Sequence, residues 1–164
     1  MISKKLGILG AAAVMAAALI PANSASAAPT GYSNLQNYNS NKCLVVLANG
    51  SKGTRATQTT CGNFKDQQWT TPSTEYVKEI RNAYSGKCLT VQGTADGAPV
   101  FEYTCTGLND QKWYLYHVGN TMALWYVNYN SNKCLLIQGP EEGNAAVQYN
   151  CAKLRDQMWT VVPL

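Results

Sequence analysis

Short segments rich in β-branched and aromatic residues alternate with turn residues along most of the chain. The stretch from residue 76 to residue 116 shows four of them, at 76–82, 88–92, 100–105 and 112–116, separated by stretches that contain glycine, asparagine, serine, aspartate and proline. This pattern predicts four short β-strands joined by turns. No stretch beyond the first 27 residues has a helical period, so we expect an all-β protein.

The same plan occurs three times in the sequence. Lys-Cys-Leu at 42–44 recurs at 87–89 and 133–135, and Asp-Gln-x-Trp at 66–69 recurs at 110–113 and 156–159. The copies are 44 to 46 residues apart, and each has a cysteine eight residues before its tryptophan. A period of this length marks one supersecondary unit that is copied along the chain. We therefore expect about twelve strands, in copies that span residues 31–73, 74–118 and 119–164.

Three copies favour a closed domain with threefold symmetry. One unit of this size cannot bury its own apolar face, but three units together can. A propeller blade has a similar period, although propellers usually need at least four blades. Strand alternation places one set of apolar side chains on the inner face, namely Leu44, Val46, Leu89, Val91, Leu135 and Ile137.

The first 27 residues have the composition of a secretory signal peptide. Lys4 and Lys5 precede an apolar run over residues 6–20, and Ala-Ser-Ala at 25–27 is a small-residue cleavage motif. The apolar run is short for a membrane span, and a retained membrane anchor is the rival interpretation. We expect cleavage after Ala27, which leaves one domain over residues 28–164 of a secreted, extracellular protein with no membrane segment.

All six cysteines lie in this domain, and export would bring them to an oxidising compartment. Six cysteines allow fifteen pairings. If each copy is one folding unit, the disulfides are Cys43–Cys61, Cys88–Cys105 and Cys134–Cys151, each stabilising the fold by about 3 kcal/mol. The sequence has no Cys-x-x-Cys pair, and its single histidine, His117, has no partner at ligand spacing. We therefore expect no metal site and no cofactor.

Composition narrows the choice of partner. The net charge of +4 falls to +2 without the two lysines of the signal peptide, and the basic residues are scattered, which disfavours a nucleic-acid partner. Ten tyrosines and four tryptophans stand against two phenylalanines. Aromatic side chains with a polar group suit half-wet surfaces, such as sugar sites and protein interfaces. Trp125 lies outside the repeat pattern, and it is either a packing residue at the start of a strand or an exposed anchor.

The triple Gln-x-Trp motif, with one expected disulfide per copy, resembles the ricin-type β-trefoil lectins, also classed as family 13 carbohydrate-binding modules. The resemblance covers the whole of residues 28–164. It implies a β-trefoil of three four-stranded copies. It also implies that Trp69, Trp113 and Trp159 fill the core, and that each motif glutamine binds neighbouring backbone.

In this family, a shallow sugar pocket in each copy combines three positions. An acidic residue follows the first cysteine by two positions, an aromatic residue precedes the second cysteine by two, and a polar residue precedes Gln-x-Trp. A carboxylate matches a pair of sugar hydroxyls, and a ring matches the apolar sugar face. The resemblance implies a second-copy pocket of Thr90, Tyr103, Asp110 and Gln111, faced by Asp96, and a third-copy pocket of Tyr149, Asp156, Gln157 and Asn144, near Glu141 or Glu142.

This sequence departs from the family at the acidic position. Val45, Thr90 and Leu136 occupy it, and strand alternation points them away from the core. An aspartate before each Gln-x-Trp, at 66, 110 and 156, puts a carboxylate at another corner of each pocket. That carboxylate can bind sugar hydroxyls or cap a turn. The first copy, with Thr59 in place of the ring, is expected not to bind.

These features predict a secreted, lectin-like protein without catalysis, whose partner is a glycan or polysaccharide. The alternative is a protein-interaction module, or a subunit of a larger secreted assembly, that has lost sugar binding. Exposed Val45 and Leu136 in former pockets would suit a protein partner. An enzyme is disfavoured because His117 has no companion nucleophile motif, and the carboxylates recur in turns instead of forming one close pair.

Overall fold

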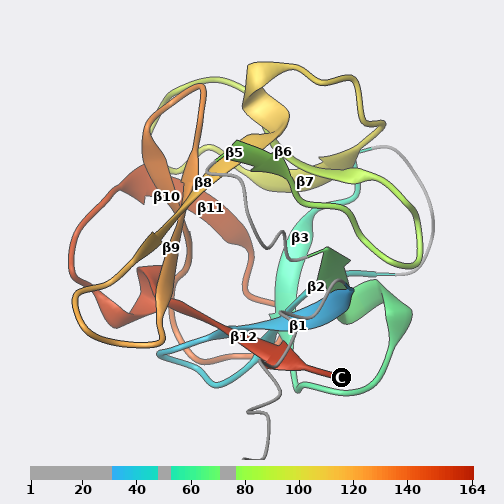
Figure 1. Cartoon of the computed structure of the whole chain (residues 1–164), viewed down its shortest axis with the longest axis vertical. Coiled ribbons are helices and arrows are strands. Elements are labelled where there is room, and N and C mark those ends of the chain that lie inside the picture. The colour runs from blue at the N-terminus through green and yellow to red at the C-terminus, as the bar shows by residue number, and fades with distance from the viewer. Residues whose placement is uncertain (1–30, 48–52, 71–76) are drawn as a thin grey trace, which may run out of the picture.

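The computed structural model describes residues 31–47, 53–70 and 77–164. The expected signal peptide, the mid-repeat turn of the first copy around Gly50 and the copy boundary near Pro72 lie outside the described residues. Strands and single turns of 3-10 helix form the regular structure of the described part (Figure 1). No helix within these ranges is long and apolar enough to cross a membrane.

The described residues form twelve strands in three sets of four, as the sequence predicts. The first set is β1 (Tyr32–Asn37), β2 (Cys43–Val46), β3 (Ala56–Thr59) and β4 (Gln68–Thr70). The second is β5 (Val77–Glu79), β6 (Cys88–Val91), β7 (Val100–Tyr103) and β8 (Lys112–His117). The third is β9 (Leu124–Asn128), β10 (Lys133–Ile137), β11 (Ala146–Asn150) and β12 (Trp159–Pro163). A 3-10 turn precedes the fourth strand of each set: η1 (Lys65–Gln67), η2 (Asn109–Gln111) and η3 (Arg155–Gln157).

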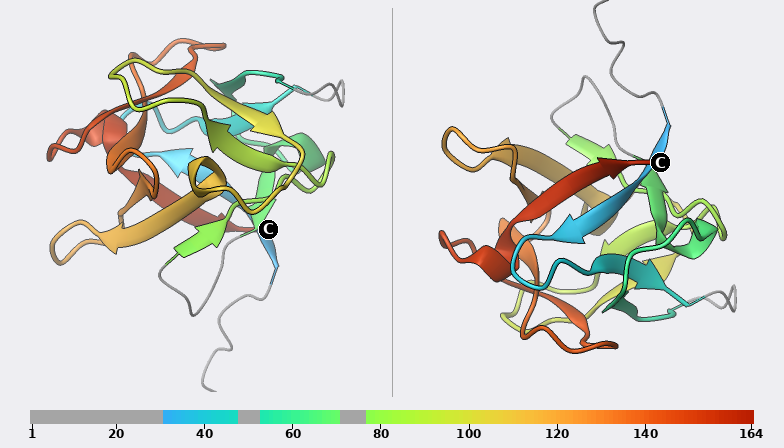
Figure 2. Two further views of the ribbon diagram at one scale, coloured as in Figure 1. Left: turned by 90° about the horizontal axis from the view of Figure 1, so that it is seen from above. Right: turned by 90° about the horizontal axis from the view of Figure 1, so that it is seen from below.

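The first and fourth strands of the sets form a closed barrel. β1 pairs with β12 and β4, β8 pairs with β5 and β9, and β9 pairs with β12, all antiparallel. A bridge between Trp69 in β4 and Asn82, just after β5, closes the remaining gap. Figure 2 shows β1 and β12, the first and last strands, running side by side in opposite directions.

The second and third strands form three hairpins, β2–β3, β6–β7 and β10–β11. Isolated bridges join the hairpins to one another, at Arg55–Phe101, Pro99–Val147 and Thr57–Ala145. Each hairpin therefore touches the other two, and the three copies are related by approximate threefold symmetry. This arrangement is the β-trefoil that the sequence predicts.

The three repeated tryptophans fill the core, as predicted. Trp69, Trp113 and Trp159 are fully buried, together with the apolar hairpin residues expected to face inward. Each indole Nε1 donates a hydrogen bond of 2.9 to 3.0 Å to the carbonyl oxygen of the leucine after the first cysteine of its copy. Because the donor lies at a barrel strand and the acceptor in a hairpin, each tryptophan fixes the hairpin to the barrel.

Three disulfides pair the cysteines within each copy, as predicted: Cys43–Cys61, Cys88–Cys105 and Cys134–Cys151. Each bond joins the second strand of a copy to the loop that leads into the 3-10 turn. The loop that carries Asp-Gln is therefore held covalently at its start and by the core tryptophan at its end.

Side-chain amides hold each copy to a neighbour. Gln58 Nε2, in β3, donates to Gly139 O at 3.0 Å and to Glu141 O at 2.8 Å. Gln148 Nε2, in β11, donates in the same way to two carbonyl oxygens in the second copy's turn, at 3.2 and 3.1 Å. The mid-repeat turn of the third copy thus lies on the first copy, and that of the second copy lies on the third.

Acidic residues in these two turns add ion pairs across the same boundaries. Glu142 Oε1 lies 2.6 Å from Lys42 Nζ, and Asp96 Oδ1 lies 2.6 Å from Lys133 Nζ. The turn of the first copy, residues 47–54, contains no acidic residue. The corresponding lysine, Lys87, instead lies 3.6 Å from the buried carboxylate of Glu102 in its own hairpin.

These contacts correct the expected positions of the turn residues. Asp96 faces the third copy and not the second, and Glu142 faces the first copy and not the third. Asn144 lies beside β3, where its carbonyl oxygen accepts from Gln58 N at 3.1 Å. Its amide donates to Gln138 O and Glu141 Oε2 within its own turn. The cause is the same in each case, because the turns cross copy boundaries.

Acid is expected to weaken the contact between the third and first copies. Hydrogen bonds from Lys42 and Thr60 hold the pKa of Glu142 at about 2, below its usual 4.5. Because the unfolded chain takes up this proton more readily, the stabilisation is complete above pH 4.5 and is lost as the pH falls toward 2. We expect the Tm of the wild type to fall more steeply over this range than that of Glu142→Gln, in thermal unfolding at low ionic strength.

The matched control is Glu141→Gln, which leaves the Glu142–Lys42 pair intact and should reproduce the wild-type slope. Parallel Tm curves for the wild type and Glu142→Gln would show that this carboxylate does not link the two copies.

Candidate functional site

The outer face of each hairpin carries two of the three expected pocket positions. In the second copy, Cys88 lies opposite Tyr103 and Thr90 lies opposite Phe101, so the four side chains share one face. Tyr103 is 36% exposed and Tyr149, its counterpart in the third copy, is 37% exposed. Both rings are therefore accessible to a ligand.

The position two residues after the first cysteine is covered in every copy. Val45, Thr90 and Leu136 are 1 to 2% exposed, although they point away from the main core, as predicted. The prediction that Val45 and Leu136 are exposed is wrong, because the loop with the 3-10 turn packs over this face of the hairpin. Their burial removes the observation that favoured a protein-interaction module.

The motif glutamines hold the covering loop in place. Gln111 Oε1 accepts from Thr106 N at 2.7 Å, and its Nε2 donates to Thr104 O at 2.8 Å and lies 3.4 Å from Thr90 Oγ1. Gln157 makes the same pair of backbone bonds in its own loop, at 2.6 and 2.9 Å. Both side chains are buried. Gln111 and Gln157 therefore position the loop from inside it.

The aspartate before each Gln-x-Trp is the middle residue of the 3-10 turn, and another copy holds its backbone. Asn128 Nδ2 donates to Asp110 O at 2.9 Å, with equivalent bonds at the other two copy boundaries. The backbone of each Asp-Gln turn is therefore fixed by an asparagine of another copy. The Oδ1 atoms of the three aspartates are buried and have no hydrogen-bond partner among the described residues.

Two opposite effects act on the pKa of the Asp156 carboxylate. Burial raises its pKa above the usual value, and the backbone N–H groups of Asp156 and Gln157 act in the opposite direction. These N–H groups belong to the 3-10 turn η3. No side-chain hydrogen bond from the described residues caps the start of η3.

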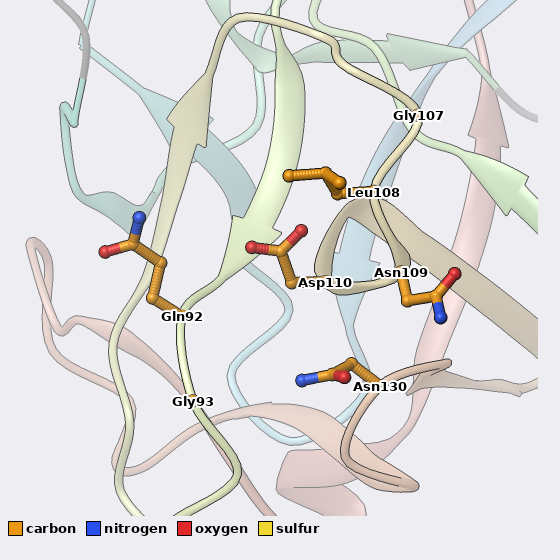
Figure 3. A pocket seen from close by; sticks show the side chains of 7 residues that line it. All are labelled: Gln92, Gly93, Gly107, Leu108, Asn109, Asp110 and Asn130. Atoms are coloured by element: carbon orange, nitrogen blue, oxygen red, sulfur yellow. The ribbon is translucent and has the colours of Figure 1, made fainter.

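A hollow of about 470 Å³ lies where the second copy meets the third. Its lining comes from the end of β6, the loop before β8 and the turn after β9: Gln92, Gly93, Gly107, Leu108, Asn109, Asp110 and Asn130. Figure 3 shows the carboxylate of Asp110 directed into the space between Gln92 and Leu108, with the amide of Asn130 across from them. Gly93 and Gly107 have φ of 87° and 75°, a conformation that favours glycine.

Of the residues expected in the second-copy pocket, Asp110 lines the hollow. Thr90 and Gln111 lie beneath the loop, and Tyr103 lies on the hairpin outside the lining. The polar residues that the sequence reasoning missed are Gln92, Asn109 and Asn130. A signal for Asn130 exists, because each copy has an Asn-x-x-Ser turn before Lys-Cys-Leu, and Asn128 Oδ1 accepts from the N–H groups of this turn.

The third copy differs at the matching place. Arg155 stands where the second copy has Asn109, and its guanidinium lies 4.8 Å from the centre of the Tyr38 ring and donates to Tyr38 O at 3.2 Å. Tyr149 lies against the second copy's turn, where a Cβ on Gly97 would sit 3.6 Å from the tyrosine hydroxyl. The third-copy surface is therefore more crowded by side chains than the hollow of the second copy.

The second-copy hollow suits a neutral ligand with many hydroxyl groups. It offers a carboxylate and three primary amides as hydrogen-bonding groups, with the exposed Leu108 as an apolar surface. Its lining contains one carboxylate, whereas glycoside hydrolysis needs two. The one described cluster with metal-ligand types, Glu79 with Cys88 and Cys105, has both sulfurs in a disulfide.

A family model described as the ricin-type beta-trefoil lectin domain matches residues 31–159. No curated protein sequence matches the chain. Among solved structures, the designed threefold-symmetric protein ThreeFoil is 29% identical with a TM-score of 0.78, and the match covers 82% of this chain and 99% of that one.

Two larger proteins contain a similar domain. The exo-beta-1,3-galactanase 1,3Gal43A from Clostridium thermocellum is 26% identical with a TM-score of 0.76, over 82% of this chain and 30% of that one. The hemolytic lectin CEL-III is 30% identical with a TM-score of 0.68, over 80% of this chain and 30% of that one. The chain thus spans under a third of each of these two proteins.

Proposed function

Since the chain belongs to the ricin-type beta-trefoil lectin family, we propose that it is a secreted carbohydrate-binding protein without catalytic activity. Its principal sugar site is the hollow between the second and third copies, and a second site lies beside Tyr149 and Asp156 in the third copy. Secretion is supported by the signal-like composition of residues 1–27 and by the pairing of every described cysteine.

The observation that carries the sugar site is the carboxylate of Asp110, which is directed into an open polar hollow. A carboxylate fixed by its backbone, with amides nearby, can bind paired hydroxyls without rearranging the fold. The similar domains in a galactanase and in a lectin support the same ligand class. A single carboxylate in the lining supports binding without hydrolysis.

A glycan array on the folded, oxidised domain tests the proposal directly. We expect binding to a limited set of glycans, with weak affinity for single sugars because the site is shallow. A folded protein that binds none of the glycans on a broad array would contradict the proposal.

Removing the carboxylate of the principal site should weaken binding. Asp110→Ala is expected to reduce the binding free energy by about 2 kcal/mol, because charge-assisted hydrogen bonds to sugar hydroxyls are lost. The measurement is calorimetric titration with a glycan that binds on the array.

The matched control for this prediction is Asp66→Ala. Asp66 holds the same place in the first copy, with the same buried Oδ1 and a backbone bond from Asn82. It should alter the Tm as Asp110→Ala does and leave sugar affinity unchanged. An equal loss of affinity in both variants would mean that the aspartates act through folding alone.

A further inference from the structure

An aromatic band lies on the outer wall of the barrel between the second and third copies. Tyr114 and Tyr116 project from β8, and Trp125 lies opposite Tyr116 on β9. Tyr129 follows β9 and completes the band. Tyr116 and Tyr129 are 47% and 38% exposed, whereas Tyr114 and Trp125 are half-buried. Figure 1 shows β8 and β9 as neighbours in the barrel.

The three tyrosine rings form one continuous series. The centre of the Tyr114 ring lies 5.2 Å from that of Tyr129 and 5.7 Å from that of Tyr116, with the ring planes tilted by 38° and 34°. Partial burial and the nearby hydroxyls of Tyr129 and Tyr116 raise the pKa of Tyr114. The band presents tyrosine hydroxyl groups beside apolar ring surface.

The trefoil does not need aromatic residues at these positions. Thr70 and Thr160, each one residue after its core tryptophan, take the place of Tyr114 in the other copies. On β9, Trp125 precedes the core residue Tyr126, and the equivalent residues before Leu35 and Ile80 are Asn34 and Glu79. Tyr114 and Trp125 are therefore departures from the symmetry of the repeat, whereas Tyr129 has a counterpart in Tyr38 of the first copy.

The band begins at the edge of the hollow. Tyr129 lies between Asn128, which holds the backbone of Asp110, and Asn130, which lines the hollow. The backbone N–H of Tyr129 donates to Lys112 O at 2.8 Å, which fixes it beside the start of β8. From there the rings follow β8 away from the hollow, toward Tyr116.

We propose that the aromatic band extends the sugar site, so that the protein binds chains of sugars, with one unit in the hollow and the following units along Tyr129, Tyr114 and Tyr116. The inference rests on the proposed function, because the occupant of the band is the continuation of a glycan held at Asp110. Tyrosine suits this ligand, since its ring packs on the apolar face of a sugar and its hydroxyl bonds to the sugar hydroxyls.

A length series of oligosaccharides tests this extension. The probes are β-1,3-linked galacto-oligosaccharides and β-1,4-linked xylo-oligosaccharides, each from the single sugar to the hexasaccharide, titrated calorimetrically into the folded domain. We expect affinity to rise about tenfold from the shortest bound sugar to the longest. Tyr116→Ala should remove most of this rise and leave affinity for the shortest bound sugar unchanged, whereas Asp110→Ala should weaken every length.

The matched control is Tyr84→Ala. Tyr84 is also an exposed tyrosine, but it lies in a turn outside the band. It should leave both affinity and length dependence as in the wild type. Equal affinity for all lengths, or a length dependence that survives Tyr116→Ala, would overturn the extension while the sugar site stands. Binding of neither series, with the array also silent, would overturn the sugar site and the extension together.

Discussion

Trp113→Phe is expected to lower the free energy of unfolding by about 3 kcal/mol. The indole is fully buried, and its Nε1 donates to Leu89 O at 2.9 Å. Phenylalanine leaves a small cavity and also leaves that carbonyl oxygen without its donor, and both effects destabilise the folded state. Guanidinium unfolding of the oxidised protein measures the change. Trp159→Phe, which removes the equivalent bond to Leu135 O, should have a similar effect.

Tyr126→Phe is the control, and it is expected not to lower the free energy of unfolding. Tyr126 is buried in the same core, and its hydroxyl has no partner among the described residues. The other copies have Leu35 and Ile80 at this place. Removing the hydroxyl should leave stability unchanged or raise it by about 1 kcal/mol. If Tyr126→Phe destabilised the protein as much as Trp113→Phe, removal of an unpaired hydroxyl would be as costly as removal of the indole, and the effect of Trp113→Phe could not be assigned to the indole hydrogen bond.

Gln111→Leu is expected to lower the free energy of unfolding by about 3 kcal/mol and to abolish sugar binding at the principal site. The substitution leaves the N–H of Thr106 and the carbonyl oxygen of Thr104 unpaired, and each unpaired group costs about 1 to 3 kcal/mol. The loop between Cys105 and Asp110 then loses its internal support. Unfolding curves and glycan titration of the same variant measure the two effects.

The control for Gln111→Leu is Gln138→Leu, an exposed glutamine in the third copy. It should change the free energy of unfolding by less than about 0.5 kcal/mol. A Gln111→Leu variant that keeps both stability and sugar affinity would show that the buried amide does not maintain the site.

The sequence was sufficient to predict the fold because its determinants repeat in register. Each copy supplies one core tryptophan, one local disulfide and one hairpin. A role that is assigned to a residue in one copy therefore applies to the equivalent residues of the other two copies. The pairing of Cys88 with Cys105 and the burial of Trp113 are properties of one unit. The repeat spacing predicts the disulfide pairing, and the resemblance to the lectin family implies the burial of the tryptophan.

The candidate site was predicted less well because it forms between units. Asp110 was identified from its own copy, but Asn130 reaches the hollow from the next one. Asp96 and Asn144 each contact the hairpin of another copy. The spacing of motifs within one copy does not predict such contacts between copies. The alternation of side chains along a strand correctly predicts that Val45 and Leu136 point away from the core, but it does not predict that a loop covers them.

The pairing of β1 with β12 sets an order of events during synthesis. Ser33, near the start of the described chain, lies opposite Pro163, near its end, so the barrel cannot close until the last strand has left the ribosome. A chain with such distant partners remains open while it is made. The disulfides span only 17 or 18 residues within one copy, so their formation does not require the barrel to be closed.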